Sequence, residues 1–188
     1  IPKSDLVVLP GGFSYGDYLR CGSMASKSKI MKSVIDFANS GGLVMGICNG
    51  FQILVETGLV PGVLLRNKYL EFICKNVFVK IDNKDNPYFK NLEKDIFELH
   101  IAHNEGNYFC TEDQLKEIKD NNQVAIYYCN NDGKIEEEFN PNGSIKNIAG
   151  ILNKEKNVLG MMPHPERMID SCLSGEDGSL FFKNLLNN

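Results

Sequence analysis

The feature of this sequence that most constrains the fold is a cysteine held between two glycines at the end of an apolar run. The run is Leu43 to Ile47, Cys48 follows it, and Gly46 and Gly50 flank the cysteine. Glycine at both positions permits a sharp strand-to-helix turn, because side chains there would crowd the backbone where the strand meets the helix. A thiol on such a turn projects outward beside a helix N-terminus. The pattern therefore predicts a nucleophile with a lowered pKa.

The composition indicates one compact domain over residues 1–188. The chain has 188 residues, of which 43% are hydrophobic, enough for a single well-buried core. Its net charge is −4 and its Lys and Arg residues are scattered, so we expect no nucleic-acid partner. No apolar run approaches the roughly 20 residues that a membrane helix needs. We therefore expect no membrane association and a cytoplasmic protein.

The six cysteines are far apart in the sequence and include no Cys-x-x-Cys pair and no Cys/His cluster at metal-ligand spacing. Free thiols in a reducing compartment explain this spacing better than a disulfide framework or a zinc site. We expect no metal site. The cysteines are Cys21, Cys48, Cys74, Cys110, Cys129 and Cys172.

Apolar periodicity predicts alternating strands and helices, and therefore an α/β fold. The strand at 5–9, the helix at 29–39 and the strand at 43–47 form a βαβ unit, which pairs its strands in parallel. The polar segment 82–95 is expected to be an exposed loop. Further strands are predicted at 71–82, 96–102, 123–129, 147–152 and 157–162, and helices at 111–119 and 180–186.

His164 is the strongest candidate for a general base. Pro163 and Pro165 fix the backbone on both sides of it, so the imidazole has little orientational entropy to lose. Glu166 follows two residues later. In an extended segment this spacing places both side chains on the same side, so the carboxylate could orient the ring.

The loop after the first strand offers backbone donors. Pro10, Gly11 and Gly12 end that strand, and amides there can point at an oxygen that develops negative charge. A tight loop without a chemical role is the alternative for a Gly-Gly pair alone. The segment 13–17 extends the loop and could form the wall of a pocket.

A cysteine, a histidine and a carboxylate far apart in sequence are the groups that thiol catalysis requires. The structural alternatives are an inert buried cysteine, a loop histidine bonded to backbone and a solvated carboxylate. The turn at Cys48 and the two prolines beside His164 favour the catalytic interpretation. His100 is expected to be a packed or edge residue of a strand, and His103 to line the pocket.

Several ordered motifs resemble those of the glutaminase subunits of phosphoribosylformylglycinamidine synthase, which are class I, triad-type glutamine amidotransferases. The resemblance runs from Asp5 to the C-terminus. The motifs are Pro10-Gly11-Gly12-Phe13-Ser14-Tyr15-Gly16-Asp17, Gly46-Ile47-Cys48-Asn49-Gly50-Phe51-Gln52, Ala102-His103-Asn104-Glu105-Gly106-Asn107-Tyr108, Asn140-Pro141-Asn142-Gly143-Ser144 and Met162-Pro163-His164-Pro165-Glu166-Arg167.

The resemblance implies a flavodoxin-like open sheet, mostly parallel, with helices on both faces. It implies that Cys48 attacks the side-chain amide of glutamine and that His164, oriented by Glu166, moves the proton. The resemblance also assigns the oxyanion hole to Gly12 and Asn49. Two further positions, Gln52 and Glu105, match residues that bind glutamine in related amidotransferases, with Glu105 on the α-ammonium group.

The family resemblance also implies partners. Glutamate is released, and ammonia passes to a synthetase subunit that aminates formylglycinamide ribonucleotide with ATP, beside a small third subunit. This chain has no P-loop, so no cofactor is expected in it, and ATP and Mg²⁺ are assigned to the synthetase. Family members begin with a further strand, helix and strand. We therefore expect an N-terminally truncated domain that lacks the first strand and helix and has an open sheet edge.

Two other functions remain compatible with the motifs. One is a truncated, inactive subunit that only docks on the synthetase. The other is a different thiol hydrolase on the same scaffold, acting on γ-glutamyl substrates. Release of glutamate from glutamine, lost on Cys48→Ala, distinguishes the glutaminase from both.

Overall fold

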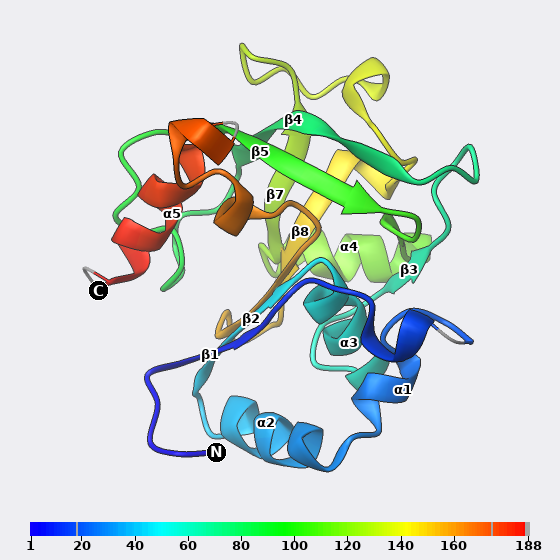
Figure 1. The fold of residues 1–188 in the computed structure, drawn as a ribbon, viewed down its shortest axis with the longest axis vertical. Helices are drawn as coiled ribbons and strands as arrows, with labels where there is room; N and C mark the ends of the chain where they lie inside the picture. The colour runs from blue at the N-terminus through cyan, green and yellow to red at the C-terminus, as the bar shows by residue number, and fades with distance from the viewer. Residues whose placement is uncertain (18, 174, 187–188) are drawn as a thin grey trace.

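The computed structural model describes residues 1–17, 19–173 and 175–186, and it has an α/β fold (Figure 1). Within these residues, seven strands form one sheet in the order β1-β2-β9-β8-β7-β4-β5, and β3 pairs with β6 in a small second sheet. The strands are β1 (Leu6–Leu9), β2 (Leu43–Ile47), β3 (Val63–Leu65), β4 (Ile73–Ile81), β5 (Ile96–His103), β6 (Asn107–Phe109), β7 (Val124–Cys129), β8 (Ile148–Leu152) and β9 (Val158–Met161).

The large sheet combines a parallel part with an antiparallel part. Strands β1, β2 and β9 pair in parallel, whereas β9-β8, β8-β7, β7-β4 and β4-β5 are antiparallel pairs. Only β8 and β4 run against the other strands of this sheet, so the expectation of an α/β fold with mostly parallel strand directions is confirmed. The parallel pairing itself is confined to the three strands that carry the predicted catalytic residues at their ends.

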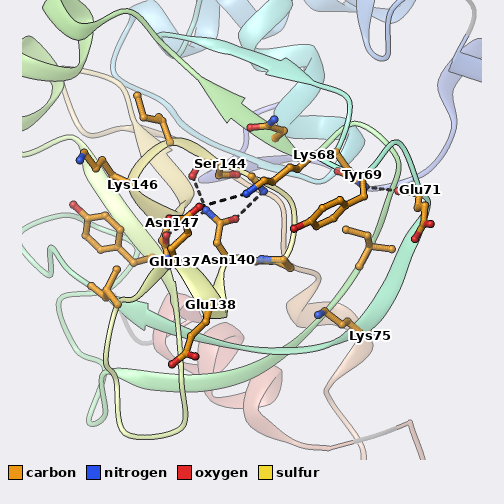
Figure 2. Close-up of a pocket in the computed structure, with 18 of the residues that line it drawn as sticks. Lys68, Tyr69, Glu71, Lys75, Glu137, Glu138, Asn140, Ser144, Lys146 and Asn147 are labelled. Atoms are coloured by element: carbon orange, nitrogen blue, oxygen red, sulfur yellow. Dashed lines mark hydrogen bonds and ion pairs between the residues drawn. The ribbon is translucent and has the colours of Figure 1, made fainter.

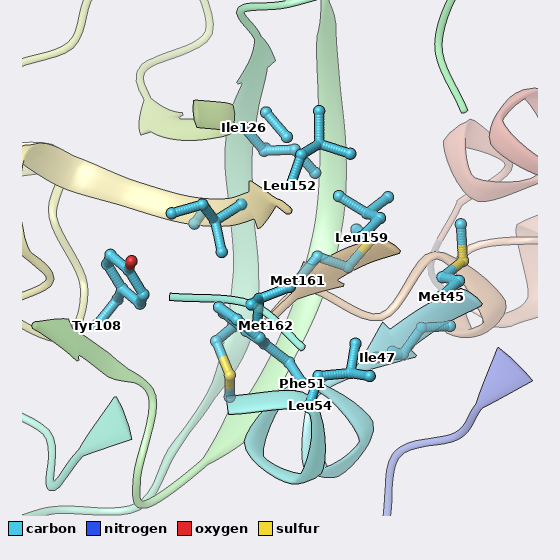
Figure 3. Packing of buried hydrophobic residues seen from close by; sticks show 14 of the residues in the cluster. Met45, Ile47, Phe51, Leu54, Tyr108, Ile126, Leu152, Leu159, Met161 and Met162 are labelled. Atoms are coloured by element: carbon cyan, nitrogen blue, oxygen red, sulfur yellow. The ribbon is translucent and has the colours of Figure 1, made fainter. Parts of the chain in front are cut away.

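The helix after the cysteine packs tightly on the parallel strands because glycines face it. A side chain at Gly46 would collide with Leu54 and Gly50, and one at Gly160 would collide with Phe51. Figure 3 shows Phe51 and Leu54 directed from this helix into the buried cluster around β2 and β9. The α-helices of the described residues are α1 (Ser23–Ser26), α2 (Lys29–Asn39), α3 (Asn49–Thr57), α4 (Glu112–Asp120) and α5 (Asp177–Leu186).

The prediction that the segment 82–95 is an exposed loop is wrong. Tyr88 and Phe89 are fully buried in it. The single proton of the Tyr88 hydroxyl is shared between the carbonyls of Val44 (2.8 Å) and Asn157 (2.6 Å). The segment therefore covers the ends of β2 and β9, and its aromatic residues contribute to the core although its average composition is polar.

The two edge strands of the large sheet differ in how they are covered. On β5, the backbone N–H of Glu98 donates to Asp177 of α5 (2.8 Å), and the carbonyl of His100 accepts from the N–H of His164 (2.7 Å). Strand β1 forms the opposite edge, where Val8 is 42% exposed. Groups of the chain itself thus cover part of the β5 edge, whereas β1 is the other edge strand of the sheet in the described residues.

None of the helices in the described part of the chain combines the length and the apolarity that crossing a bilayer requires.

Candidate active site at the cysteine turn

Cys48 lies on a strained turn between β2 and α3. Its φ of 49° and ψ of −102° are unusual for a residue with a side chain. The turn is held from the neighbouring strand, since the Cys48 N–H donates to the carbonyl of Met161 (2.8 Å). The thiol is buried and donates to the carbonyl of Ala102 at 3.7 Å. The predicted sharp turn is confirmed, and it places the sulfur beside the ends of β9 and β5.

His164 follows β9 and is 1% exposed. Its Nδ1 lies 2.5 Å from Oε1 of Glu166, so the carboxylate accepts the Nδ1–H and leaves Nε2 as the lone-pair nitrogen. Nε2 is buried and has no partner among the described residues. The sequence correctly predicted that Glu166 pairs with His164, but it predicted an extended backbone between them. The backbone is not extended: Pro165–Arg167 form a 3-10 turn that brings Glu166 back to the ring.

Gly11 shows that the histidine and the cysteine are neighbours. A Cβ atom built on Gly11 would lie 2.5 Å from His164 Cε1, 3.1 Å from His164 Nδ1 and 3.6 Å from Cys48 Cβ. The imidazole and Cys48 therefore line one small space, and Gly11 forms its third wall. This contact joins the ends of β1, β2 and β9, which are adjacent in the sheet.

The expected low pKa of Cys48 is wrong. Burial raises the pKa of this thiol to about 12, because a thiolate loses its hydration there. The Asn49 backbone N–H and the charge of Arg167 act in the opposite direction, whereas Glu166 and Asp17 add to the increase. Burial therefore raises the pKa of Cys48 by more than the helix N-terminus lowers it. In the resting site Cys48 is a thiol, and it needs a base to become a nucleophile.

Glu166 is suited to hold a positively charged ring. Burial alone would raise its pKa, but the hydrogen bond from His164, the charge of that ring and Arg167 together hold the pKa of Glu166 below its ordinary value. The carboxylate therefore stays ionised at neutral pH. An ionised partner favours the imidazolium that forms when His164 takes a proton.

A chain of side-chain contacts links the other predicted residues. The amide of Asn49 donates to Oε1 of Gln52 (2.8 Å), and the amide of Gln52 donates to the backbone carbonyl of Glu105 (2.8 Å). The Glu105 carboxylate accepts the N–H of Cys21 (3.3 Å) and lies 3.9 Å from Nε of Arg66. Asn49, Gln52 and Glu105 therefore form one continuous wall that begins directly beside Cys48.

Gly12 lies in the predicted loop with φ of 145°, and a side chain there would meet no atom within 4 Å. The 3-10 segment Ser14–Asp17 that follows contains left-handed Tyr15 and Gly16. Ser14 Oγ and Asp17 Oδ1 are buried there without a hydrogen-bond partner in the described residues. Of these two residues, Asp17 is close enough to Cys48 for its charge to affect the pKa of that thiol.

Asn67 is a supporting residue that the sequence did not reveal. Its Oδ1 accepts the N–H of Gly106 (3.1 Å) and lies 3.1 Å from Nδ1 of His103, while its Nδ2 donates to the carbonyls of His103 (2.9 Å) and Glu71 (2.8 Å). Asn67 thus clamps both ends of the loop that carries Glu105. His103 is buried in this clamp, and its Nε2, like that of His164, has no hydrogen-bond partner among the described residues.

A polar groove of about 1570 Å³ lies on the other side of this clamp. Figure 2 shows Asn140 bonded to Ser144 and Asn147 on one side of the groove, with Tyr69 and Glu71 opposite and the Lys68 ammonium reaching Glu137 (3.3 Å). Neither Cys48, His164 nor Glu166 lines it. The loop 140–144, most of which lines the groove, supports the Glu105 loop, because its buried Asn142 donates to the carbonyl of Gly106 (2.8 Å).

A nucleophile at a strand-to-helix turn, with a histidine–carboxylate pair from a neighbouring strand, defines a thiol enzyme on an α/β sheet. A family model described as a CobB/CobQ-like glutamine amidotransferase domain matches residues 1–175. The chain belongs to this family, and it is a glutamine amidotransferase.

Named relatives narrow the family further. The chain is 77% identical over 188 residues to phosphoribosylformylglycinamidine synthase subunit PurQ of Pelagibacter ubique (strain HTCC1062), and 47% identical over 189 residues to the PurQ subunit of Aquifex aeolicus (strain VF5). Each match covers 100% of this chain and 83% of the relative. The solved structure of PurLQS from Thermotoga maritima matches with a TM-score of 0.86 and 41% identity, over 100% of this chain and 81% of that one. These matches confirm the resemblance found in the motifs.

Proposed function

We propose that this chain is the glutaminase subunit of a phosphoribosylformylglycinamidine synthase of purine biosynthesis, and that it hydrolyses glutamine to glutamate and ammonia. Family membership and the identity with PurQ subunits support the assignment. The observation that carries the chemistry is the buried, unpartnered Nε2 of His164, held beside Cys48 by the bond from Nδ1 to Glu166.

The first step forms a tetrahedral intermediate on Cys48. Nε2 of His164 takes the proton of the Cys48 thiol while the sulfur attacks the side-chain amide carbon of glutamine. The raised pKa of Cys48 makes this transfer necessary, because little thiolate exists at neutral pH. Glu166 stabilises the imidazolium through Nδ1.

Backbone donors at Gly12 and Asn49 stabilise the oxyanion in this proposal. Asn49 is the first residue of α3, and its N–H already lies close enough to the Cys48 sulfur to lower the pKa of that thiol. Gly12 lies in the open loop after β1. Such donors typically contribute about 10²-fold or more to the rate.

The second step releases ammonia. The imidazolium of His164 returns its proton to the departing amide nitrogen, the C–N bond breaks, and a γ-glutamyl thioester remains on Cys48. Water, deprotonated by the same nitrogen, then attacks the thioester and frees glutamate and the thiol. Gln52 and Glu105 bind the substrate, with Glu105 facing its α-ammonium group, because they form the wall that starts at Asn49.

The ammonia goes to a synthetase subunit, and ATP and Mg²⁺ act there rather than in this chain. The solved relative is a PurLQS assembly, which supports a complex with a synthetase and a small third subunit. Exposed Phe13 and Phe72, whose ring centroids are 6.3 Å apart, give the loop beside Gly12 an apolar surface of the kind that marks docking sites. A cytoplasmic location stays a prediction.

Initial rates of glutamate release, measured with and without a synthetase subunit, test the proposal. We expect Cys48→Ala and His164→Ala to lose at least about 10³-fold in kcat, and Glu166→Gln to lose less. Cys172→Ala is the control, because that exposed cysteine lies outside the site. An inactive native protein that still binds the synthetase would mean a docking subunit. Activity on γ-glutamyl peptides but not on glutamine would mean another thiol hydrolase.

A further inference from the structure

A second hydrogen-bonded thiol lies on the open face of the β4-β5 hairpin. Asn76 of β4 is directly opposite His100 of β5, and Cys74 is opposite Ala102, so Cys74 is the diagonal neighbour of His100. Residues alternate between faces along a strand, so Cys74 and Asn76 share one face. Both are exposed, whereas Val77 and Val79, which follow on the opposite face of β4, are buried. Cys74 is a different thiol from Cys48, although it lies near that site: the Cys48 sulfur donates to the carbonyl of Ala102, the residue opposite Cys74.

The hydrogen bonds of this group have a defined direction. The Glu98 carboxylate can only accept, so it takes the Nδ2–H of Asn76 at 3.3 Å. The Asn76 oxygen then faces Nδ1 of His100 at 2.9 Å and makes that nitrogen the protonated one. Nε2 of His100 is left as the acceptor, and it lies 3.4 Å from the sulfur of Cys74.

The surroundings keep the His100 ring neutral at pH 7. Burial and the charges of Arg167 and His164 lower the pKa of His100, against an opposing effect of Glu166. A neutral ring has a free lone pair on Nε2. This lone pair can accept the thiol proton while the sulfur attacks, and no permanent thiolate is needed on Cys74.

We propose that Cys74 is a modification site that forms mixed disulfides with small disulfide molecules, with His100 as its general base and Asn76 as the residue that orients the base. In this exchange the Cys74 proton passes to Nε2 of His100 and the sulfur attacks one sulfur of the small disulfide. The S–S bond of that molecule breaks, a mixed disulfide forms on Cys74, and the departing thiolate takes up the proton. The disulfide molecule is the oxidant, and no other redox partner is needed.

The other exposed cysteine provides an internal control. Cys172, in the 3-10 turn Ser171–Leu173, is also exposed, and its N–H donates to the carboxylate of Asp170 just before that turn (2.8 Å). The structure shows a histidine nitrogen within hydrogen-bond distance of the sulfur of Cys74 but shows no such contact for Cys172 in the described residues. Comparing the reaction rates of these two exposed thiols therefore shows the effect of a neighbouring base.

Oxidised glutathione is the probe. The native chain is incubated with it at pH 7.5, free thiols are blocked at intervals, and the glutathionylated fraction of each cysteine peptide is measured by mass spectrometry. We expect Cys74 to react at least about tenfold faster than Cys172, since a positioned base gives that much or more. Equal rates for the two cysteines, or faster reaction of Cys172, would overturn the proposal.

Variants test whether the reactivity of Cys74 comes from His100 or only from the exposure of its thiol. His100→Gln keeps the backbone carbonyl that accepts from His164 and should slow modification of Cys74 about tenfold, with Cys172 unchanged. Asn76→Ala should also slow it, and Asn76→Asp, which retains an acceptor for Nδ1–H, should restore most of the rate. Thermal unfolding checks that each variant is folded. If Cys74 reacts at the native rate in folded His100→Gln or in folded Asn76→Ala, then His100 is not its base.

Discussion

Gly11→Ala tests the contact that joins the glycine loop to the catalytic histidine. Gly11 is outside the left-handed region, so alanine can adopt its backbone conformation without strain. The new methyl group would lie 2.5 Å from Cε1 and 3.1 Å from Nδ1 of His164. Carbon atoms in contact prefer roughly 3.5–4.0 Å, so the ring must move by roughly 1 Å.

The size of the effect follows from this displacement. Misplacing a catalytic group by roughly 1 Å lowers the rate about 10²-fold, which corresponds to about 2.7 kcal/mol in the activation free energy. The methyl group also comes within 3.6 Å of Cys48 Cβ, which is an ordinary contact and adds little. We therefore expect kcat for glutamine hydrolysis to fall about 10²-fold, with the free energy of unfolding changed much less.

The assay is glutamate release from radiolabelled glutamine, repeated in the His164→Ala background. Alanine at position 164 leaves room for the methyl group, so Gly11→Ala should there reduce the residual rate by less than about twofold. This double-mutant cycle separates displacement of the ring from any effect on neighbouring Gly12. A native kcat for Gly11→Ala would refute the placement of His164 against the loop. A 10²-fold loss in both backgrounds would show that displacement of the His164 ring does not cause the loss.

Three further expectations concern the clamp and the titrating groups. Asn67→Ala frees the loop that carries Glu105, so the KM for glutamine should rise about tenfold while kcat changes less; an unchanged KM in initial-rate measurements would count against the clamp. Iodoacetamide should alkylate Cys48 slowly at pH 7 and steadily faster up to pH 10, because its pKa is raised to about 12; a plateau by pH 8 would contradict this. Burial, with a contribution from His164, lowers the pKa of His103 from 6.5 to about 4, so the unfolded chain binds the proton more readily. The free energy of unfolding should therefore fall by about 3 kcal/mol from pH 6.5 to 4, and in urea titrations His103→Gln should lack that part of the decrease.

Features set by neighbouring residues could be predicted from the sequence. Gly46 is small because α3 crosses the sheet closely there, and a side chain at Gly46 would meet Leu54 and Gly50, which are near it in the sequence. The Thr111 cap of α4 is likewise local, since Thr111 and Gln114 form a capping box. Most strands and helices therefore lie within a residue or two of their predicted positions.

Features set by tertiary contacts could not be predicted in this way. The pKa of Cys48 depends on how deeply Ala102 and its neighbours bury the sulfur, so the helix-terminus argument gave the wrong direction. Asn67 stands between Arg66 and Lys68 with no motif around it, and only the fold brings it to the Glu105 loop. Tyr88 is hidden in a polar segment, so its average composition concealed its burial.

The most direct measurement is to trap the covalent intermediate. The native chain, with a synthetase subunit present, is mixed with labelled glutamine, quenched in acid within the first turnovers and digested for peptide mass spectrometry. The mechanism predicts a γ-glutamyl thioester on the Cys48 peptide, absent from Cys48→Ala. Label on another cysteine, or rapid glutamate release from Cys48→Ala, would contradict it.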